Sequence, residues 1–277
     1  MENIITDVIF SLSTTKEGEI FFMLITTFNV NSVRTRLPIL TRWLTDNHPD
    51  FLFLQETKTQ NDSFPASAFS ALGYSSFFCG EKSYNGVAVL MKSGLKTDVS
   101  FGFEEGDYTT RVLTLRHRGL TVLNTYVPQG KELFSPSYDE KKAFLGRVKK
   151  IVEREKSGLF LWLGDLNVAP EPIDVTHPEN KKKHVCFTQE IRDIFADTRA
   201  GLTDLLRKFD TSPNIYTFYD YRVKDAVTRG IGWRIDHMLA SERLAELAEW
   251  CRPDVEPRTW DKPSDHVPLS AKFTEVQ

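Results

Sequence analysis

Four strand-like apolar segments of this sequence end in carboxylate or amide side chains. The transitions run from Phe28 to Asn29, from Leu54 to Gln55 and Glu56, from Leu163 to Asp165 and Asn167, and from Ile235 to Asp236. Strand ends that share one rim of a sheet form a natural cleft. Because neighbouring carboxylates repel one another, such a cluster needs a cation among them. The pattern predicts a sheet-based domain with an acidic, cation-binding edge.

The composition is that of an ordinary globular protein. The 277 residues are 40% hydrophobic and 26% charged. Lys and Arg total 35 against 38 Asp and Glu, which excludes a generally basic DNA-coating protein but is compatible with a local basic face. Cys79, Cys186 and Cys251 show no Cys-x-x-Cys spacing, which disfavours a zinc cluster or disulfide scaffold and indicates the cytoplasm. The apolar runs are far shorter than the roughly 20 residues of a membrane helix.

Residues 1–22 fit neither a secretory signal nor a transit peptide. They carry Glu2, Asp7, Glu17 and Glu19 against Lys16 alone, whereas a signal begins with basic residues and a transit peptide avoids acidic ones. The first strand-like run begins at Met23. We therefore expect a surface extension over residues 1–22, or a start codon placed too early, followed by a single domain over residues 23–277.

Helical and strand-like patterns alternate along the chain, and no repeat or linker divides it. Apolar spacing predicts helices around residues 33–44 and 144–152, and Thr188 is expected to cap a helix with Ile191, Ile194 and Phe195 facing inward. Strands are predicted at residues 50–54, 84–91, 111–115, 120–126, 159–163, 215–218, 233–239 and 267–273. This mixture predicts an α/β fold in which helices cover the sheets.

Oxygen-bearing side chains dominate the candidate site, which favours Mg²⁺ or Mn²⁺ over zinc. Glu56 is a candidate ligand, although a Glu after an apolar run is commonly a solvated strand end. Asp165 and Asn167 lie two residues apart, so on extended backbone they point to the same side. An acid beside an amide can deprotonate and orient a water molecule. The alternative is an Asx-turn that satisfies only the local backbone.

Ser264-Asp265-His266 is the third candidate element. His266 is either a packed strand residue or a partner of Asp236, and an Asp-His pair fixes the imidazole tautomer and favours its charged form near phosphate. Asp265 is placed to reach the metal side of the cleft. The remaining histidines are interpreted as surface or core residues: His48, His117, His177, His184 and His237.

Other hydrolytic and nucleotide-binding motifs are absent from the sequence. It contains no Gly-x-Ser-x-Gly elbow, no P-loop and no His-Glu-x-x-His helix. The remaining chemistry is the metal-assisted attack of water on a phosphate ester.

Together, six motifs resemble the exonuclease III family of abasic-site (AP) endonucleases. In that family's order they are Thr27-Phe28-Asn29-Val30-Asn31, Leu54-Gln55-Glu56-Thr57-Lys58, Tyr126-Val127-Pro128-Gln129-Gly130, Gly164-Asp165-Leu166-Asn167, Trp233-Arg234-Ile235-Asp236 and Ser264-Asp265-His266. The resemblance implies a four-layer α/β sandwich, with two mixed β-sheets packed face to face and helices on the outer faces. It also implies the wider endonuclease/exonuclease/phosphatase superfamily and dependence on Mg²⁺.

The resemblance implies roles by matching position. Glu56 is expected to bind the metal, Asp265 to be a second or water-mediated ligand, and Asn31 to contribute where relatives have Asp or Asn. Ser32 follows Asn31 where many relatives have Gly, so this turn is expected to differ slightly.

The catalytic roles follow in the same way. Asp165 is expected to activate the attacking water and Asn167 to orient it, while Asn29 supports the cluster. The two phosphate contacts are then Tyr126, which holds the phosphate or assists the leaving oxygen, and His266, which is oriented by Asp236.

The same match places Phe218, Trp233 and Ile235 around an apolar pocket that fits an abasic sugar turned out of the helix. The alternative is three core residues on adjacent strands. DNA phosphates are expected at Arg222, Lys224 and Arg229, and more weakly at the basic run of Lys181, Lys182, Lys183 and His184.

The sequence thus predicts a monomeric DNA-repair enzyme that acts on double-stranded DNA containing abasic sites, with no membrane partner. It hydrolyses the phosphodiester 5′ to the lesion and leaves a 3′-hydroxyl, with 3′→5′ exonuclease or 3′-end cleaning as a related activity. The alternatives are a phosphoinositide phosphatase, a sphingomyelinase, a nuclease of the deoxyribonuclease I type, or a non-catalytic binding relative. The last is disfavoured because Glu56, Asp165, Asn167 and His266 are all present.

Overall fold

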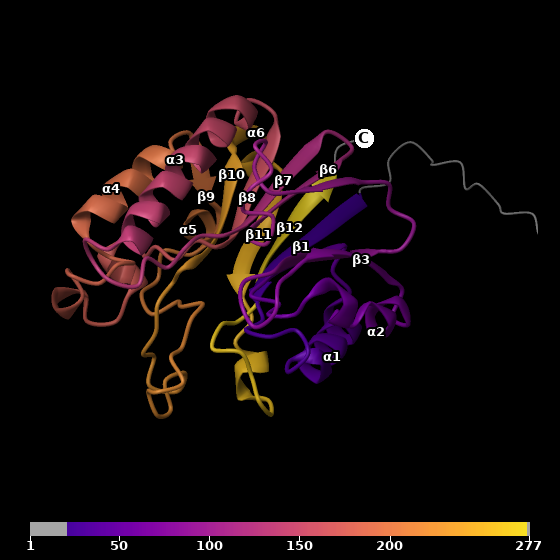
Figure 1. Cartoon of the computed structure of the whole chain (residues 1–277), viewed down its shortest axis with the longest axis horizontal. Coiled ribbons are helices and arrows are strands. Elements are labelled where there is room, and N and C mark those ends of the chain that lie inside the picture. Colours follow the sequence, from indigo (N-terminus) through magenta and orange to yellow (C-terminus); the bar gives the residue numbers. More distant parts are fainter. Residues whose placement is uncertain (1–20, 276–277) are drawn as a thin grey trace, which may run out of the picture.

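Two six-stranded mixed sheets pack face to face in the computed structural model, which describes residues 21–275 (Figure 1). Across the first sheet the strands are β11 (Ala248–Pro253), β12 (Leu269–Glu275), β1 (Phe21–Asn29), β2 (Phe51–Gln55), β4 (Val87–Lys92) and β3 (Tyr74–Cys79). Across the second they are β5 (Asp98–Phe101), β6 (Val112–His117), β7 (Leu120–Tyr126), β8 (Leu159–Asp165), β10 (Asp236–Ser241) and β9 (Leu202–Asp204). The pairs β1–β2 and β7–β8 are parallel, and each is joined through a helix.

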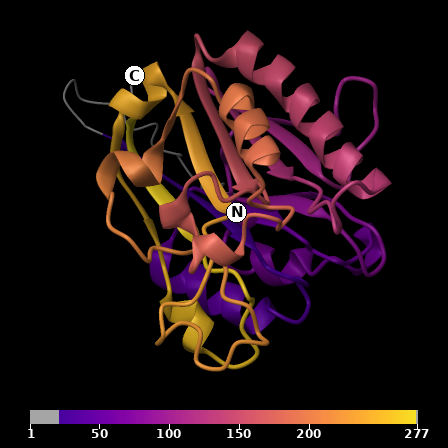
Figure 2. The same ribbon diagram turned by 90° about the vertical axis from the view of Figure 1, so that its left-hand side faces the viewer.

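Helices cover the outer face of each sheet. On the first sheet lie α1 (Leu37–Asn47) and α2 (Ala66–Ser70); on the second lie α3 (Pro136–Glu155) and α4 (Gln189–Thr198), side by side (Figure 2). Two short helices, α5 (Leu205–Phe209) and α6 (Glu242–Glu246), contribute to the core between the sheets. The 3₁₀ turns are η1 (Asn61–Ser63), η2 (Pro172–Asp174), η3 (Pro178–Asn180) and η4 (Glu256–Thr259).

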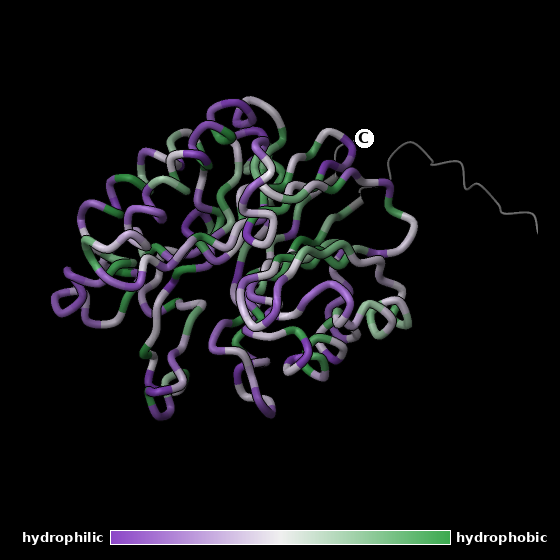
Figure 3. Tube along the Cα trace, in the orientation of Figure 1, coloured by the Kyte–Doolittle hydropathy of each residue, from purple (hydrophilic) through white to green (hydrophobic). Residues whose placement is uncertain are grey.

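Side chains along a strand point alternately to its two faces, and this explains why the central strands are apolar throughout. In β8, Leu161 and Leu163 face the other sheet, whereas Phe160 and Trp162 face α3 and α4. A strand buried on both faces has no polar side, so its sequence is a continuous apolar run. Figure 3 shows these hydrophobic strands at the centre and hydrophilic segments on the outer helices. The result is the predicted four-layer sandwich of helix, sheet, sheet and helix.

The rows that face the inside of the sandwich change from apolar to polar at one end. They are Ile25, Thr27 and Asn29 in β1; Phe51, Phe53 and Gln55 in β2; Val122, Asn124 and Tyr126 in β7; Leu161, Leu163 and Asp165 in β8; and Ala240, Met238 and Asp236 in β10. The candidate site therefore continues the core, at the edge where these strands end.

Several predicted elements are confirmed. Strands occupy residues 51–55, 120–126 and 159–165, and helices follow at 37–47 and 136–155. Thr188 caps α4, since its Oγ1 accepts a hydrogen bond from the Ile191 backbone amide at 3.2 Å. Ile191 and Phe195 are buried, and Ile194 is partly buried.

Other predicted boundaries are wrong. Residues 215–218 form no strand: only Phe218 makes isolated bridges, to Trp233 and His266. The strand predicted from Trp233 begins at Asp236, the one predicted from Tyr84 begins at Val87, and Val33 precedes its helix. Phe218, Trp233 and Ile235 line a cavity, and Val33 packs in one apolar cluster with α1, so their burial did not require a ladder of hydrogen bonds. Tyr84 is exposed. The strands β3, β5, β9 and β11 were not predicted, because they are short or only partly buried.

The predicted extension lies almost entirely outside the described residues. Phe21 and Phe22, assigned to it from the sequence, belong to β1 and pair with Glu275 and Thr274. Within residues 21–275, no helix is long and apolar enough to cross a membrane.

A buried amide pair joins the two sheets. The Gln55 Nε2 donates to Asn124 Oδ1 at 2.7 Å and to Thr27 Oγ1 at 2.9 Å, and Asn124 Nδ2 donates to the Leu54 carbonyl at 3.2 Å. Because all of these atoms are buried, each amide depends on the other for hydrogen bonds that water cannot supply.

We predict that Asn124→Ala lowers the free energy of unfolding by about 1–3 kcal/mol, because it removes acceptor and donor from this buried contact. Urea denaturation measures the change. Thr45→Ala, on the exposed face of α1, serves as a control expected to stay within about 0.5 kcal/mol of the wild type. Equal stability of the two variants would contradict a role for the amide pair.

Candidate active site

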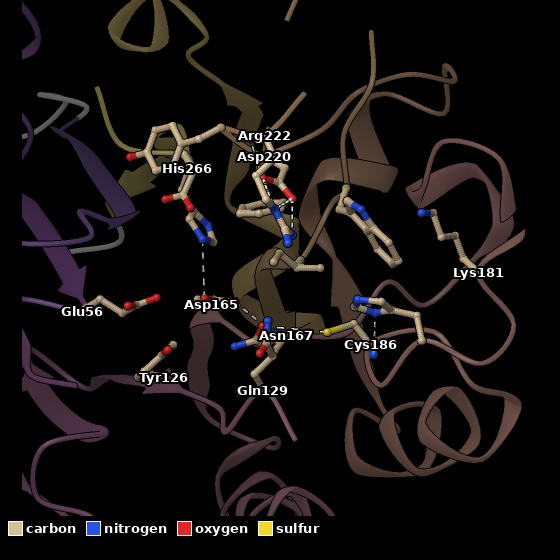
Figure 4. A pocket seen from close by; sticks show the side chains of 16 residues that line it. Glu56, Tyr126, Gln129, Asp165, Asn167, Lys181, Cys186, Asp220, Arg222 and His266 are labelled. Carbon is tan, nitrogen blue, oxygen red and sulfur yellow. Dashed lines mark hydrogen bonds and ion pairs between the residues drawn. The ribbon is translucent and has the colours of Figure 1, made fainter. Parts of the chain in front are cut away.

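A single amide links the carboxylates that the two sheets contribute to the site. The Asn29 Nδ2 donates to Glu56 Oε1 at 2.8 Å and to Asp165 Oδ2 at 2.9 Å. Asn29 and Glu56 come from the ends of β1 and β2, and Asp165 from the end of β8. Figure 4 shows Glu56, Asp165, Tyr126 and His266 facing one another across the resulting cleft. The predicted clustering of strand-end residues is confirmed.

Left-handed backbone turns the chain sharply after these strands. Asn31, Glu56 and Asn167 have φ angles of 43°, 49° and 50°, which non-glycine residues adopt at an energetic cost and which cluster at functional sites. Gly164 has φ of 130°, and a Cβ there would lie 2.0 Å from the Thr125 carbonyl oxygen. Only glycine allows β8 to approach β7 closely just before Asp165.

His266 lies between two buried carboxylates. Its Nδ1 contacts Asp236 Oδ2 at 2.8 Å, and its Nε2 lies 3.8 Å from Asp165 Oδ2. Burial lowers the pKa of His266, but the charges of Asp236 and Asp165 outweigh burial and raise it well above the ordinary value of 6.5. Burial also raises the pKa of Asp165, while the charge of His266 opposes this change. The predicted Asp236–His266 contact is confirmed, and it holds an imidazolium in the cleft.

On the opposite wall, oxygen atoms converge on a cation. The Lys58 Nζ lies 2.7 Å from Glu56 Oε2 and 2.6 Å from Asn31 Oδ1, and Asn31 Nδ2 donates to Asp265 Oδ1 at 3.0 Å. Burial raises the pKa of Glu56, but Lys58 and Asn29 more than compensate, so its pKa is lowered and the carboxylate is ionised. A site whose oxygens already surround an ammonium fits a hard metal cation.

Among the described residues, Glu56, Asp165 and His266 form a group whose ligand atoms all lie within 4.8 Å of one another. The carboxylates of Glu56 and Asp165 and the Asn31 oxygen are donors of the kind that a hard cation prefers. Glu56 lies beside Lys58, and Asp165 lies beside His266.

Tyr126 ends β7 directly beside Asp165, its neighbour in the parallel register. Burial, together with the charges of Glu56 and Asp165, raises its pKa well above 10. The guanidinium of Arg111 packs over the ring, 4.6 Å from its centroid. The phenol therefore keeps its proton and can donate a hydrogen bond into the cleft.

A cavity of about 640 Å³ opens beside the carboxylates, and all three predicted pocket residues line it. Phe218 packs edge-on against His266, with 5.0 Å between ring centroids, and its backbone bridges to Trp233. Ile235 is 6% exposed. Thr217 Oγ1 accepts hydrogen bonds from the backbone amides of Ile235 and Asp236, so the side of the cavity and the partner of His266 share one support.

The basic residues predicted to meet DNA phosphates lie in two segments, only parts of which reach the cavity. Arg222 lines the cavity but forms an ion pair with Asp220, at 2.6 Å. Lys224 and Arg229 are exposed on the same loop and do not line it. Of the run that begins at Lys181, only Lys181 and His184 line the cavity, and the His184 ring packs at a tilt against Trp233, with 4.5 Å between ring centroids. His184 is exposed, as its interpretation as a surface residue predicts, and it lies at the edge of the cavity.

Sequence reasoning also missed several residues at the site. Lys58 and Gln129 belong to two of the family motifs, and membership of those motifs could have identified them. Nothing in the sequence distinguished Cys186, Asp220 or Tyr221 as site residues. These last three lie in loops that have no regular pattern of apolar residues.

Known nucleases resemble this chain over most of its length. Residues 26–266 match the sequence profile of the Endonuclease/Exonuclease/phosphatase family. Exodeoxyribonuclease III of Haemophilus influenzae is 32% identical over 264 residues, covering 89% of this chain and 98% of that protein. An AP endonuclease structure from Archaeoglobus fulgidus has 44% identity and a TM-score of 0.87, covering 91% and 99% of the two chains. A Neisseria 3′ phosphatase bound to a product DNA hairpin has 38% identity and a TM-score of 0.85, with the same coverage.

We predict that Asp236→Asn lowers the pKa of His266 by about 1–3 pH units, because the charged form loses its closest anionic partner. In the wild type, the stability from this pair is complete below the ordinary value of 6.5 and is lost as pH rises through the raised pKa. NMR titration of the imidazole measures both values. Asp220→Asn, which removes the partner of Arg222, is the control and should leave His266 unchanged. A wild-type titration in Asp236→Asn would contradict the pairing.

Proposed function

Because the chain belongs to the endonuclease/exonuclease/phosphatase family, we propose that it is a DNA-repair AP endonuclease. It hydrolyses the phosphodiester 5′ to an abasic site and leaves a 3′-hydroxyl. One observation carries this proposal: the buried Asp165 of the carboxylate cluster opens directly onto a cavity whose lining includes the bulky apolar side chains of Phe218, Trp233 and Ile235. A phosphate at the cluster would thus place its adjoining sugar in the cavity.

Metal dependence is a property of this family, and we propose Mg²⁺ as the ion, with Mn²⁺ as an alternative. Glu56 and Asp265 would hold it, and the Asn31 oxygen is the additional donor on the same wall. When bound, the ion supplies positive charge that polarises the phosphate and neutralises the developing negative charge.

The remaining steps belong to the side chains. Asp165, whose pKa is raised by burial, is suited to take a proton from the attacking water. The Asn167 backbone amide donates to Asp165 Oδ1 at 3.0 Å and keeps that carboxylate turned toward the cleft. We propose that the Asn167 side chain orients the water and that Asn29 holds Asp165 beside Glu56.

Two donors are placed for the phosphate. The imidazolium of His266, fixed by Asp236, would hydrogen-bond a non-bridging oxygen, and the protonated Tyr126 would hold the phosphate or assist the leaving oxygen. His266 is buried and Tyr126 is partly buried, so their interactions with an anion would be less screened by solvent than those of surface groups.

The cavity supports selectivity for an abasic sugar. A nucleotide without a base loses no base pair when it turns out of the duplex, and bulky apolar walls disfavour a normal nucleotide. Arg222, Lys224 and Arg229 lie together on the loop beside the cavity and are proposed to contact DNA phosphates. Affinity for DNA should therefore fall steeply as salt increases.

A second activity at 3′ ends is favoured by the relatives. The Neisseria structures are described as a 3′ phosphatase and a 3′→5′ exonuclease, and each is 38% identical to this chain. We propose that this site also removes 3′-terminal groups. We further propose that the chain acts as a monomer in the cytoplasm, where its three free cysteines stay reduced.

The decisive experiment uses a labelled duplex with one synthetic abasic analogue, beside an undamaged duplex, each with Mg²⁺ and with EDTA. We expect Mg²⁺-dependent incision immediately 5′ to the lesion and little nicking of intact DNA. Equal nicking of both duplexes would remove the role of the cavity. Failure to shorten recessed 3′ ends under incising conditions would refute the second activity.

We predict that Asp165→Asn lowers turnover of the abasic duplex by a factor of about 10²–10⁴, because an amide cannot accept the proton of the attacking water. DNA affinity should stay close to that of the wild type, since the pocket and basic loop are unchanged. Single-turnover kinetics and fluorescence anisotropy measure the two quantities. Asp193→Asn, on the exposed side of α4, is the control. Wild-type turnover in Asp165→Asn would exclude Asp165 from the mechanism.

A further inference from the structure

A fully buried lysine lies behind the active-site cleft. Lys141, in the first half of α3, is 0% exposed. Its Nζ donates to the carbonyl oxygens of Asn167 at 2.7 Å, Val185 at 2.9 Å and Gln129 at 3.1 Å. An ammonium has three N–H groups, so every donor is satisfied. Burying an unpaired charge costs a large free energy, so the buried position of Lys141 depends on its three acceptors.

The three acceptors come from three separate segments of the cleft. Gln129 follows β7, Asn167 follows β8, and Val185 precedes α4. Gln129, Asn167 and Cys186, the residue after Val185, all line the catalytic cavity (Figure 4). The ammonium therefore connects three loops whose residues line the cavity.

The contact with Lys141 supports an unusual backbone conformation at Asn167. It lies in the left-handed region, at φ 50°, just after the strand ends. Its amide donates to Asp165, its side chain donates to the Val127 carbonyl at 2.9 Å, and its own carbonyl accepts from Lys141. Without the ammonium, that carbonyl would lose its charged donor.

The lysine stem is closely packed as well. A Cβ added to Gly130 would lie 3.3 Å from Lys141 Cδ and 3.1 Å from Tyr138 Cδ2. Gly130 therefore leaves the space through which the stem of Lys141 passes from α3 to its three acceptors. Through Lys141, the helix α3 thus helps to fix the positions of the three loops that contain Gln129, Asn167 and Val185.

We propose that Lys141 is a positioning residue for phosphodiester hydrolysis, which acts by holding the backbone of Asn167 and Gln129 at the reacting centre. This inference rests on the proposed function, because it assigns Asn167 to the water-binding side of the reaction. Lys141 touches no substrate; it acts through the loops that do.

The test compares Lys141→Met with Lys142→Met in the full chain, using Mg²⁺ and the abasic duplex. Methionine has a similar length and volume but no donor. Lys142 is the matched control, since it follows directly on α3 but pairs with Asp139 and Glu190 at the surface. In Lys141→Met we expect kcat to fall by about 10- to 100-fold with a much smaller change in KM. Lys142→Met should retain wild-type kinetics.

Thermal unfolding separates this effect from loss of folding, since kcat is measured well below the midpoint of each variant. A double-mutant cycle with Asn167→Ala gives a second test. In the Asn167→Ala background, Lys141→Met should lower kcat much less than it does in the wild type. Wild-type kcat in Lys141→Met, or full additivity in the cycle, would overturn the inference.

A readout independent of activity distinguishes failure of this inference from failure of the proposed function. If the wild type does not incise abasic DNA, the proposed function fails on its own. The side-chain amide resonance of Asn167 is then compared by NMR: we expect it to shift or broaden in Lys141→Met and to stay unchanged in Lys142→Met. An unchanged resonance in Lys141→Met would refute the positioning role.

Discussion

The hydrogen bonds of the Asn29 amide to Glu56 and Asp165 are the contact on which this site depends. The Asn29 Nδ2 lies 2.8 Å from Glu56 Oε1 and 2.9 Å from Asp165 Oδ2, and these carboxylates come from opposite sheets. Two buried carboxylates repel each other, and a neutral donor between them reduces that repulsion without neutralising either. The packing of the two sheets therefore sets the distance between Glu56 and Asp165.

The same strands build both the core and the site. Their inward rows are apolar along most of their length, and become polar only in the last residues before the cleft. The apolar part fixes the sheets against each other through close packing. The polar ends are consequently held as rigidly as the core, which is what preorganised catalysis requires.

Buried charge surrounds this edge in compensated groups. Arg234 lies between Asp174 and Asp204 directly behind the pocket wall, with contacts of 2.7 Å to each. His266 lies between Asp236 and Asp165. Lys141 instead uses three carbonyls. Each cation satisfies groups from different segments, and Lys141 does so for loops of the cleft that have no regular secondary structure.

The sequence alone determined the central buried strands and their polar ends, because apolar runs and the polar residues that end them are local properties of the chain. Asn29, Glu56, Asp165, Asp236 and His266 could thus be predicted as one cluster, and the family motifs supplied their order. Only the tertiary structure showed that Lys58 bridges Glu56 and Asn31, that His184 packs on Trp233, and that Lys141 holds three loops. These contacts join residues far apart in the chain through irregular segments, whose conformation is decided by packing rather than by any local pattern.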